Sequence, residues 1–259
     1  MEDVLNQIGI FGIVPVVRLD RPEDAVPLGR ALIEGGLPCA EITFRTEAAE
    51  EAIRRLTAEL PEMLIGAGTV LTVDQAKRAV AAGAKFIVTP GFNPPVVQYC
   101  VENNIPITPG VSNPSDIDMA LGFGLKVLKF FPAEVLGGLE AIKAIGAVYG
   151  MVKFIPTGGV NTANLNEYLS FPKVHAIGGS WMVKPDLISA GNFEEITRLT
   201  REAVQTMLGF TLAHVGINTA DAEEAMAVAR RLCKYHPADL IRLRRQITER
   251  MLEAERYVV

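Results

Sequence analysis

A lysine interrupts the apolar run at residues 127–132 (VLKFFP). Alternate side chains of an extended strand share a face, so Lys129 lies on the same face as Val127 and Phe131, and Phe131 is expected to line its site. Burial disfavours a charged ammonium, and a partly neutral amine is a nucleophile that attacks ketone carbonyls. The pattern therefore indicates Schiff-base chemistry with a ketone. Position alone equally allows a lysine that extends to the rim of the fold or pairs with a carboxylate.

Residues 39–45 (CAEITFR) carry polar side chains on one face, namely Glu41, Thr43 and Arg45. An inward carboxylate near an inward lysine forms an acid/base pair, and Glu41 could shuttle protons during carbinolamine formation, dehydration and enamine protonation. Arg45, at the end of the run, could bind an oxo-acid carboxylate with two parallel hydrogen bonds. The alternatives are a buried Glu41 salt bridge without chemistry and a rim salt bridge of Arg45.

Two other runs also end in residues that could bind an anion. Arg18 ends residues 12–18 and could serve the same pocket or a distal anion, or form a rim salt bridge. In residues 64–70 (LIGAGTV), Gly66 and Gly68 would let a ligand approach the backbone, and the Thr69 hydroxyl would be available to an oxo-acid oxygen.

Two glycine pairs, Gly158-Gly159 and Gly178-Gly179, end the last two apolar runs, and Ser180 follows the second pair. Glycine pairs at short helix starts expose backbone N–H groups that bind phosphate. The alternative is two tight turns that need only the backbone freedom of glycine. Two pairs on neighbouring strands favour a phosphate site.

Short β-branched runs alternate with amphipathic stretches at a spacing of about two dozen residues, which predicts an α/β fold of the (β/α)₈ TIM barrel type. A doubly wound open sheet is disfavoured because candidate site residues stand at nearly every run's carboxyl end. The predicted strands are residues 12–18, 39–45, 64–70, 86–90, 106–111, 127–132, 153–159 and 174–180.

Helices are predicted between these runs. A first helix spans residues 2–9 and an eighth spans 194–208. Thr72, Asn93 and Asn113 have the side chains of helix N-caps. The barrel is therefore expected to occupy residues 1–208, with a short, mainly helical appendage at 209–259. In that appendage, residues 210–217 resemble a strand and helices flank His236-Pro237.

The net charge of −5 and the pI near 5.4 disfavour nucleic acid and anionic membranes as partners. Cys39, Cys100 and Cys233 are scattered without CxxC spacing, and such a pattern is typical of free thiols in a reducing cytoplasm. No basic segment followed by an apolar one opens the chain, so secretion is not expected. No window of the sequence approaches about 18 uninterrupted apolar residues, so membrane insertion is not expected either.

The histidines, His175, His214 and His236, are isolated and lack metal-ligand spacing, so structural roles are expected for all three. The sequence also has no dinucleotide fingerprint and no Ser/His/Asp pattern in a suitable context. We therefore expect neither a metal nor a cofactor.

Five ordered motifs resemble the 2-dehydro-3-deoxy-phosphogluconate/4-hydroxy-2-oxoglutarate aldolase family over residues 4–208. They are EITFRT (41–46), GAGTV (66–70), KFFPAE (129–134), PTGGV (156–160) and IGGSW (177–181). The resemblance implies a homotrimer without a metal. It also implies retro-aldol cleavage of a 2-oxo acid to pyruvate and an aldehyde that leaves first.

The resemblance implies a role for each motif. Lys129 would be the Schiff-base lysine and Glu41 the proton acceptor, while Arg45 and Thr69 would bind pyruvate. Thr157 would lie near the carbinol centre and influence which aldehyde face is accepted. The phosphate would be held by Gly158, Gly159, Gly178, Gly179 and Ser180.

Several alternatives remain open at this point. The substrate could be the phosphogluconate, the phosphogalactonate or the unphosphorylated oxoglutarate derivative. The same barrel could be a phosphosugar isomerase or decarboxylase without a covalent lysine, or an idle scaffold or metabolite sensor. The appendage resembles the start of a glyoxalase-like module, in which only His214 matches a metal ligand.

Overall fold

The computed structural model describes residues 2–209, 221, 223–224 and 227. The predicted appendage at 209–259 lies outside this part of the chain, apart from Gly209 and the isolated positions. Its strand-like segment at 210–217 and the residues His214, Cys233 and His236 are therefore not described.

All strand pairs in the described residues are parallel. The strands are β1 (Ile13–Val17), β2 (Cys39–Thr43), β3 (Leu64–Gly68), β4 (Phe86–Val88), β5 (Ile107–Thr108), β6 (Gly110–Val111), β7 (Val127–Phe130), β8 (Lys153–Pro156) and β9 (Ile177–Gly179). Every predicted run contains a strand, which confirms the parallel α/β class. The fifth run contains two short strands, because Pro109 between them has no N–H to donate to a neighbour.

The strands form two sheets, ordered β5-β4-β3-β2-β1-β9 and β6-β7-β8. Isolated parallel bridges between Phe154 and Val174, and between Thr157 and Gly178, join β8 to the segment that contains β9. These bridges place the ends of the last two strands next to each other.

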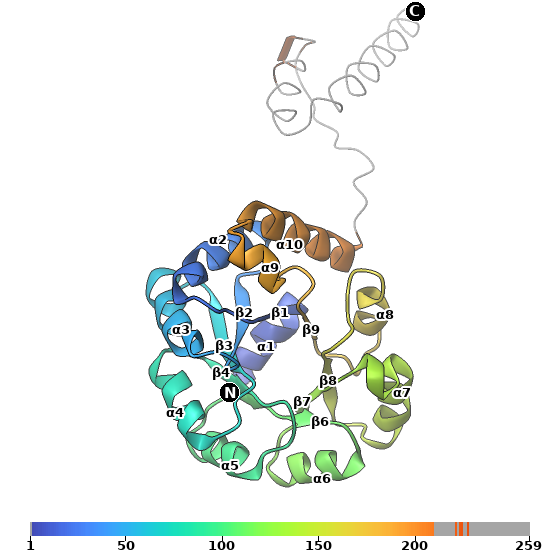
Figure 1. Cartoon of the computed structure of the whole chain (residues 1–259). Helices are drawn as coiled ribbons and strands as arrows, with labels where there is room; N and C mark the ends of the chain where they lie inside the picture. The colour runs from blue at the N-terminus through green and yellow to red at the C-terminus, as the bar shows by residue number, and fades with distance from the viewer. Residues whose placement is uncertain (1, 210–220, 222, 225–226, 228–259) are drawn as a thin grey trace, which may run out of the picture. The chain divides into compact units, whose positions relative to one another are not determined.

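Helices surround the strands (Figure 1). They are α1 (Glu2–Phe11), α2 (Ala25–Gly35), α3 (Ala48–Glu59), α4 (Val73–Ala81), α5 (Pro94–Glu102), α6 (Pro114–Gly122), α7 (Gly138–Val148), α8 (Leu165–Leu169), α9 (Pro185–Ser189) and α10 (Phe193–Leu208), with 3-10 turns at Pro22–Asp24 and Glu134–Leu136. The first and last predicted helices are confirmed to within two residues at each end. Thr72, Asn93 and Asn113 each accept a backbone N–H three residues on, as predicted for N-caps.

The helix α10 packs against α2, which brings the end of the described chain back to its beginning. Thr197 Oγ1 donates to the Ala31 carbonyl at 3.3 Å. A Cβ at Gly35 would lie 2.5 Å from Thr200, so only glycine lets the two helices approach this closely.

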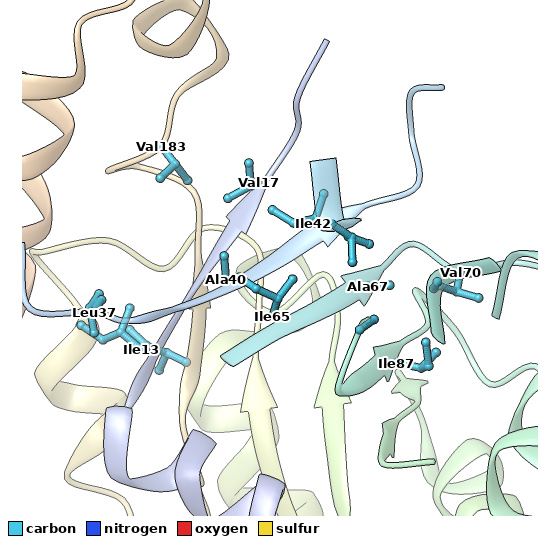
Figure 2. Packing of buried hydrophobic residues seen from close by; sticks show 14 of the residues in the cluster. Ile13, Val17, Leu37, Ala40, Ile42, Ile65, Ala67, Val70, Ile87 and Val183 are labelled. Atoms are coloured by element: carbon cyan, nitrogen blue, oxygen red, sulfur yellow. The ribbon is translucent and has the colours of Figure 1, made fainter. Parts of the chain in front are cut away.

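Apolar side chains cover both faces of the strands. On the face toward the helices, Figure 2 shows Val17, Ile42 and Ile65 in the larger core cluster. On the opposite, inner face, a second cluster includes Phe86 and Ile155 and packs against Ile8 of α1. In Figure 1, α1 lies in the middle of the surrounding helices. A charged side chain on the inner face is therefore surrounded by apolar groups, which makes it costly unless it has a partner.

Candidate active site

Lys129 of β7 and Glu41 of β2 meet on the inner face. Their exposed fractions are 5% and 4%, and Lys129 Nζ donates a hydrogen bond to Glu41 Oε1 over 3.2 Å. Every other ion pair among the described residues includes an arginine or lysine that is about half exposed. A buried ion pair contributes little net stability because desolvation offsets the attraction. An amine within hydrogen-bond distance of a carboxylate is, however, the arrangement that an activated nucleophile needs.

The Glu41 carboxylate fits because its neighbour on β3 is a glycine. A Cβ at Gly68 would lie 2.0 Å from Glu41 Oε1, and one at Gly66 would lie 2.3 Å from the Phe86 ring. Real side chains do not approach so closely. Glycine at these two positions therefore makes room for the side chains of Glu41 and Phe86. The sequence had suggested only that a ligand approaches the backbone there.

Lys129 and Glu41 share a cavity of about 10 Å³ with Thr108 and Thr157, among other residues. That volume is close to what one water molecule needs. Lys129 Nζ also lies 5.3 Å from the centroid of the Phe131 ring, so these side chains are near each other as predicted. Thr108, which is 2% exposed, was missed in the sequence. It could have been recognised as a polar residue on the inward face of the predicted strand at residues 106–111.

Arg45 and Thr69 lie in the turns after β2 and β3. Arg45 Nε donates to Thr69 Oγ1 over 3.2 Å, so the structure brings together the two residues predicted to bind pyruvate. Thr69 has a φ of 54°, in the left-handed region that β-branched residues rarely adopt. Such a conformation costs roughly 1–3 kcal/mol and is concentrated at ligand sites.

Arg18 follows β1 and forms an ion pair with Asp20 over 3.0 Å. Both side chains are about half exposed, and no hydrogen bond or ion pair joins Arg18 to another candidate residue in the described part of the chain. The structure therefore shows the rim salt bridge that was one of the three alternatives for Arg18.

One glycine pair, Gly158-Gly159, follows β8, and the other, Gly178-Gly179, ends β9. Thr157 is bridged to Gly178, and a Cβ at Gly178 would lie 2.3 Å from Thr157 Oγ1. Gly158 and Gly159 have φ values of 99° and 86°, which favour glycine. Ser180 is exposed.

One expectation about these pairs is wrong. The following helices begin at Leu165 and Pro185, so neither glycine pair is at a helix start. Gly158-Gly159 lies in the loop after β8, and Gly178-Gly179 forms the end of β9.

Neither a metal cluster nor a membrane span appears in the described residues. They contain no group of three or more metal-ligating side chains, and none of their helices is long and apolar enough to cross a bilayer. His175 Nε2 lies 2.7 Å from the Leu5 carbonyl oxygen, which connects the segment before β9 to α1. This is a structural contact, as predicted for His175.

A buried lysine–carboxylate pair on parallel strands fits an enzyme that bonds carbonyl substrates covalently. A sequence profile described as "KDPG and KHG aldolase" matches residues 4–199. The chain belongs to this family, which confirms the resemblance found in the sequence.

Similar proteins agree with this membership. The chain is 52% identical to 2-dehydro-3-deoxy-phosphogluconate aldolase of Treponema pallidum (strain Nichols), over 74% of this chain and 92% of that protein. It is 44% identical to KHG/KDPG aldolase of Escherichia coli (strain K12), over 74% and 91%. The crystal structure of KDPG aldolase from Legionella pneumophila with pyruvate captured at low pH as a covalent carbinolamine intermediate matches with a TM-score of 0.75 and 40% identity, over 77% of this chain and 97% of that one.

Proposed function

We propose that this chain is a class I aldolase, a lyase that reversibly cleaves 2-dehydro-3-deoxy-6-phosphogluconate to pyruvate and glyceraldehyde 3-phosphate. The same site would cleave 4-hydroxy-2-oxoglutarate to pyruvate and glyoxylate. The observation that carries the proposal is the buried contact of 3.2 Å between Lys129 Nζ and Glu41 Oε1. The carbinolamine captured in the related Legionella enzyme supports it.

Lys129 and Glu41 perform the chemistry in this proposal. Glu41 takes a proton from the ammonium, and the free Nζ attacks C2 of the 2-oxo acid to give a carbinolamine. Glu41 returns the proton to the C2 hydroxyl, which leaves as water, and an iminium remains. Glu41, which is a carboxylate again, takes the C4 hydroxyl proton as the C3–C4 bond breaks, so the aldehyde departs and an enamine is left. Glu41 then returns this proton to C3, and addition of water to the resulting iminium releases pyruvate and Lys129.

The residues around the pair bind the ends of the substrate. Arg45 and Thr69, which are already hydrogen-bonded to each other, hold the pyruvate carboxylate. Phe131 packs against the reacting carbons, and Thr157 lies near C4.

The distal end of the substrate is bound by the loop after β8 and by the end of β9. Backbone N–H groups of Gly158, Gly159, Gly178 and Gly179, with the Ser180 hydroxyl, bind the phosphate. The bridge between Thr157 and Gly178 supports this assignment because it places the start of the loop after β8 beside β9.

Borohydride reduction in the presence of pyruvate tests the covalent step. We expect a reduced pyruvate adduct on the peptide that contains Lys129, and we expect Lys129→Arg to lose both the adduct and nearly all cleavage. A folded protein that forms no adduct would refute the imine. Appreciable cleavage by Lys129→Arg would instead favour a non-covalent isomerase or decarboxylase on the same fold.

A coupled assay of pyruvate release identifies the substrate. It would compare the phosphogluconate derivative, the phosphogalactonate derivative and 4-hydroxy-2-oxoglutarate. We expect the phosphogluconate derivative to be cleaved with the highest kcat/KM. Tight binding of all three without pyruvate release would indicate a metabolite sensor.

We also propose the finer architecture. The strands form an eight-stranded (β/α)₈ barrel within residues 1–208, and residues 209–259 form a separate appendage. This is supported by the pairing of β1 with both β2 and β9 and by the bridges between β8 and β9. The enzyme is proposed to be a cytoplasmic homotrimer, which sedimentation analysis would test. The free thiols of Cys39 and Cys100 fit a reducing compartment.

A further inference from the structure

Glu134 begins the 3-10 turn after β7 and contacts the loop after β8. The Glu134 N–H donates to the Gly158 carbonyl over 3.1 Å, and the Ala133 N–H donates to the Thr157 carbonyl over 2.8 Å. These bonds attach the end of the strand that carries Lys129 to the loop assigned to phosphate.

The Glu134 side chain covers the outer side of the same loop. A Cβ at Gly159 would lie 2.3 Å from Glu134 Cγ, so the aliphatic part of Glu134 packs directly on the Gly159 backbone. The Gly159 carbonyl accepts hydrogen bonds from Asn161 Nδ2 over 3.1 Å and Asn164 Nδ2 over 3.3 Å. The loop is thus held in one conformation by contacts from outside the site.

Tyr168 of α8 fixes the position of the Glu134 carboxylate. Its side chain is buried, with an exposed fraction of 2%, and its hydroxyl donates to Glu134 Oε1. Burial, reinforced by this hydrogen bond, raises the pKa of Tyr168 above its ordinary value, so the hydroxyl remains a donor. A Cβ at Gly138 would lie 2.9 Å from the Tyr168 hydroxyl and 3.0 Å from Glu134 Oε1, so glycine there leaves room for the contact.

We propose that Glu134 and Tyr168 are a positioning pair that holds the Gly158-Gly159 turn in the conformation that binds the substrate's phosphate. Neither side chain contacts the substrate. The inference rests on the proposed function. Backbone N–H groups bind an anion well only when they are already oriented, because otherwise binding must also order the loop. Loss of the pair should therefore weaken binding of a phosphorylated substrate and leave imine formation with pyruvate unchanged.

Three variants separate the contributions of packing, hydrogen bonding and charge. Glu134→Ala removes the packing on Gly159, and Tyr168→Phe removes only the hydroxyl. For both variants we expect KM for 2-dehydro-3-deoxy-6-phosphogluconate to rise roughly threefold to tenfold, which is the effect of losing one hydrogen bond. Their kcat should stay within about twofold of that of the protein without substitutions. Glu134→Gln keeps the packing and an acceptor for Tyr168, so it should retain nearly the original KM.

The second readout is the rate of borohydride trapping with pyruvate, which carries no phosphate. It should stay constant in all three variants. Lys143→Ala is the matched control. Lys143 lines a surface groove together with Glu134 and Tyr168, and within the described part of the chain it pairs only with Glu140, over 2.7 Å. Its KM and trapping rate should both stay unchanged.

The outcomes distinguish this inference from the proposed function. Equal losses in cleavage and trapping, or an unchanged KM in both Glu134→Ala and Tyr168→Phe, would overturn the positioning role alone. Absence of cleavage and trapping in the unchanged protein would overturn the proposed function and the inference with it. If Glu134→Ala does not fold, Tyr168→Phe decides the question, since it keeps the buried ring.

Discussion

At the scale of single residues, the position of the Glu41 carboxylate depends on the absence of a side chain at Gly68. A methyl group at residue 68 would lie where Glu41 Oε1 now lies, since the separation would be 2.0 Å. We therefore expect Gly68→Ala to displace Glu41 from Lys129 and to lower kcat by roughly 100-fold, as for other displaced catalytic groups. Steady-state cleavage assays would measure the loss.

Gly122→Ala is the control for this substitution. Gly122 ends α6, and no other atom lies within 4 Å of the position of an added Cβ. This variant should keep the original kcat. A folded Gly68→Ala protein with unchanged kcat would show that Glu41 need not occupy its observed position.

The buried thiols give a second residue-scale prediction. Burial raises the pKa of the Cys100 thiol to about 12 and also raises that of Cys39. Both thiols should therefore resist iodoacetamide at pH 8 in the folded protein and react after unfolding in urea, as peptide mass spectrometry would measure. Rapid alkylation of either peptide before unfolding would contradict this.

The same shifts give the sign of a pH effect. A thiol whose pKa is higher in the folded state contributes its full stability below the pKa of the unfolded thiol, about 8.5. That contribution decreases as the pH rises above this value, so alkaline conditions should lower the free energy of unfolding.

The site residues that were predictable from the sequence are those that differ in polarity from the residues beside them. Lys129 and Glu41 were recognisable because each is charged within an apolar run. Thr108 was missed because a threonine before a proline is common in sequences and does not by itself indicate a site. The role of Gly68 depends on a side chain from the neighbouring strand, which only the fold brings close.

At the scale of elements, Asn93 connects a helix start to a loop near the site. Its Oδ1 accepts the Val96 N–H over 3.3 Å, and its Nδ2 donates to the Leu71 carbonyl over 2.9 Å. We expect Asn93→Ala to lower the free energy of unfolding by about 1–2 kcal/mol, because it removes an N-cap and a loop contact. Urea denaturation would measure the change.

Gln98→Ala in the same helix is the reference for this measurement. Gln98 is exposed, and its side chain bonds only the exposed side chain of Glu102 among the described residues. Its removal should therefore change the free energy of unfolding by no more than about 0.5 kcal/mol. Equal effects of the two substitutions would mean that the cap contributes nothing.

Strands and helices were predicted well, but their ends were not. Each predicted run contains a strand because parallel strands covered on both faces are apolar throughout. The predicted strands were too long. Polar residues of the following turn, such as Arg45, continue the alternation of inward and outward side chains beyond the last residue that pairs with a neighbouring strand. The glycine pairs were wrongly expected at helix starts, because the loops that follow them have no distinctive pattern.

At the scale of the whole molecule, the aldolase unit should function without the appendage. The Treponema relative aligns over 92% of its own length with only 74% of this chain. A protein truncated after Gly209 should therefore fold and keep its kcat and KM within about twofold, the scatter expected when nothing in the site is altered. Loss of activity with retained helical circular dichroism would show that residues 210–259 contribute to catalysis.

The family and the parallel α/β class were predictable from the sequence because the strand repeat and five motifs supported the same conclusion. The appendage was not, since only His214 matches a metal ligand of the module that its opening segment resembles. So few residues are too few for a second independent core, and they leave few constraints from which to infer a fold.

The apolar side chains between Lys129 and α1 also affect the order in which substrates bind and products leave. Ile8 of α1 and the side chains packed on it, among them Phe86 and Ile155, occupy the inner space on that side of the lysine. Reactants must then enter and leave on the side where Arg45 and the glycine loops lie. In the proposed reaction the pyruvate fragment is bonded to Lys129 and is therefore the inner one, so we expect the aldehyde to leave first in cleavage and pyruvate to enter first in condensation. Product inhibition should accordingly follow an ordered pattern, with pyruvate as the last product released.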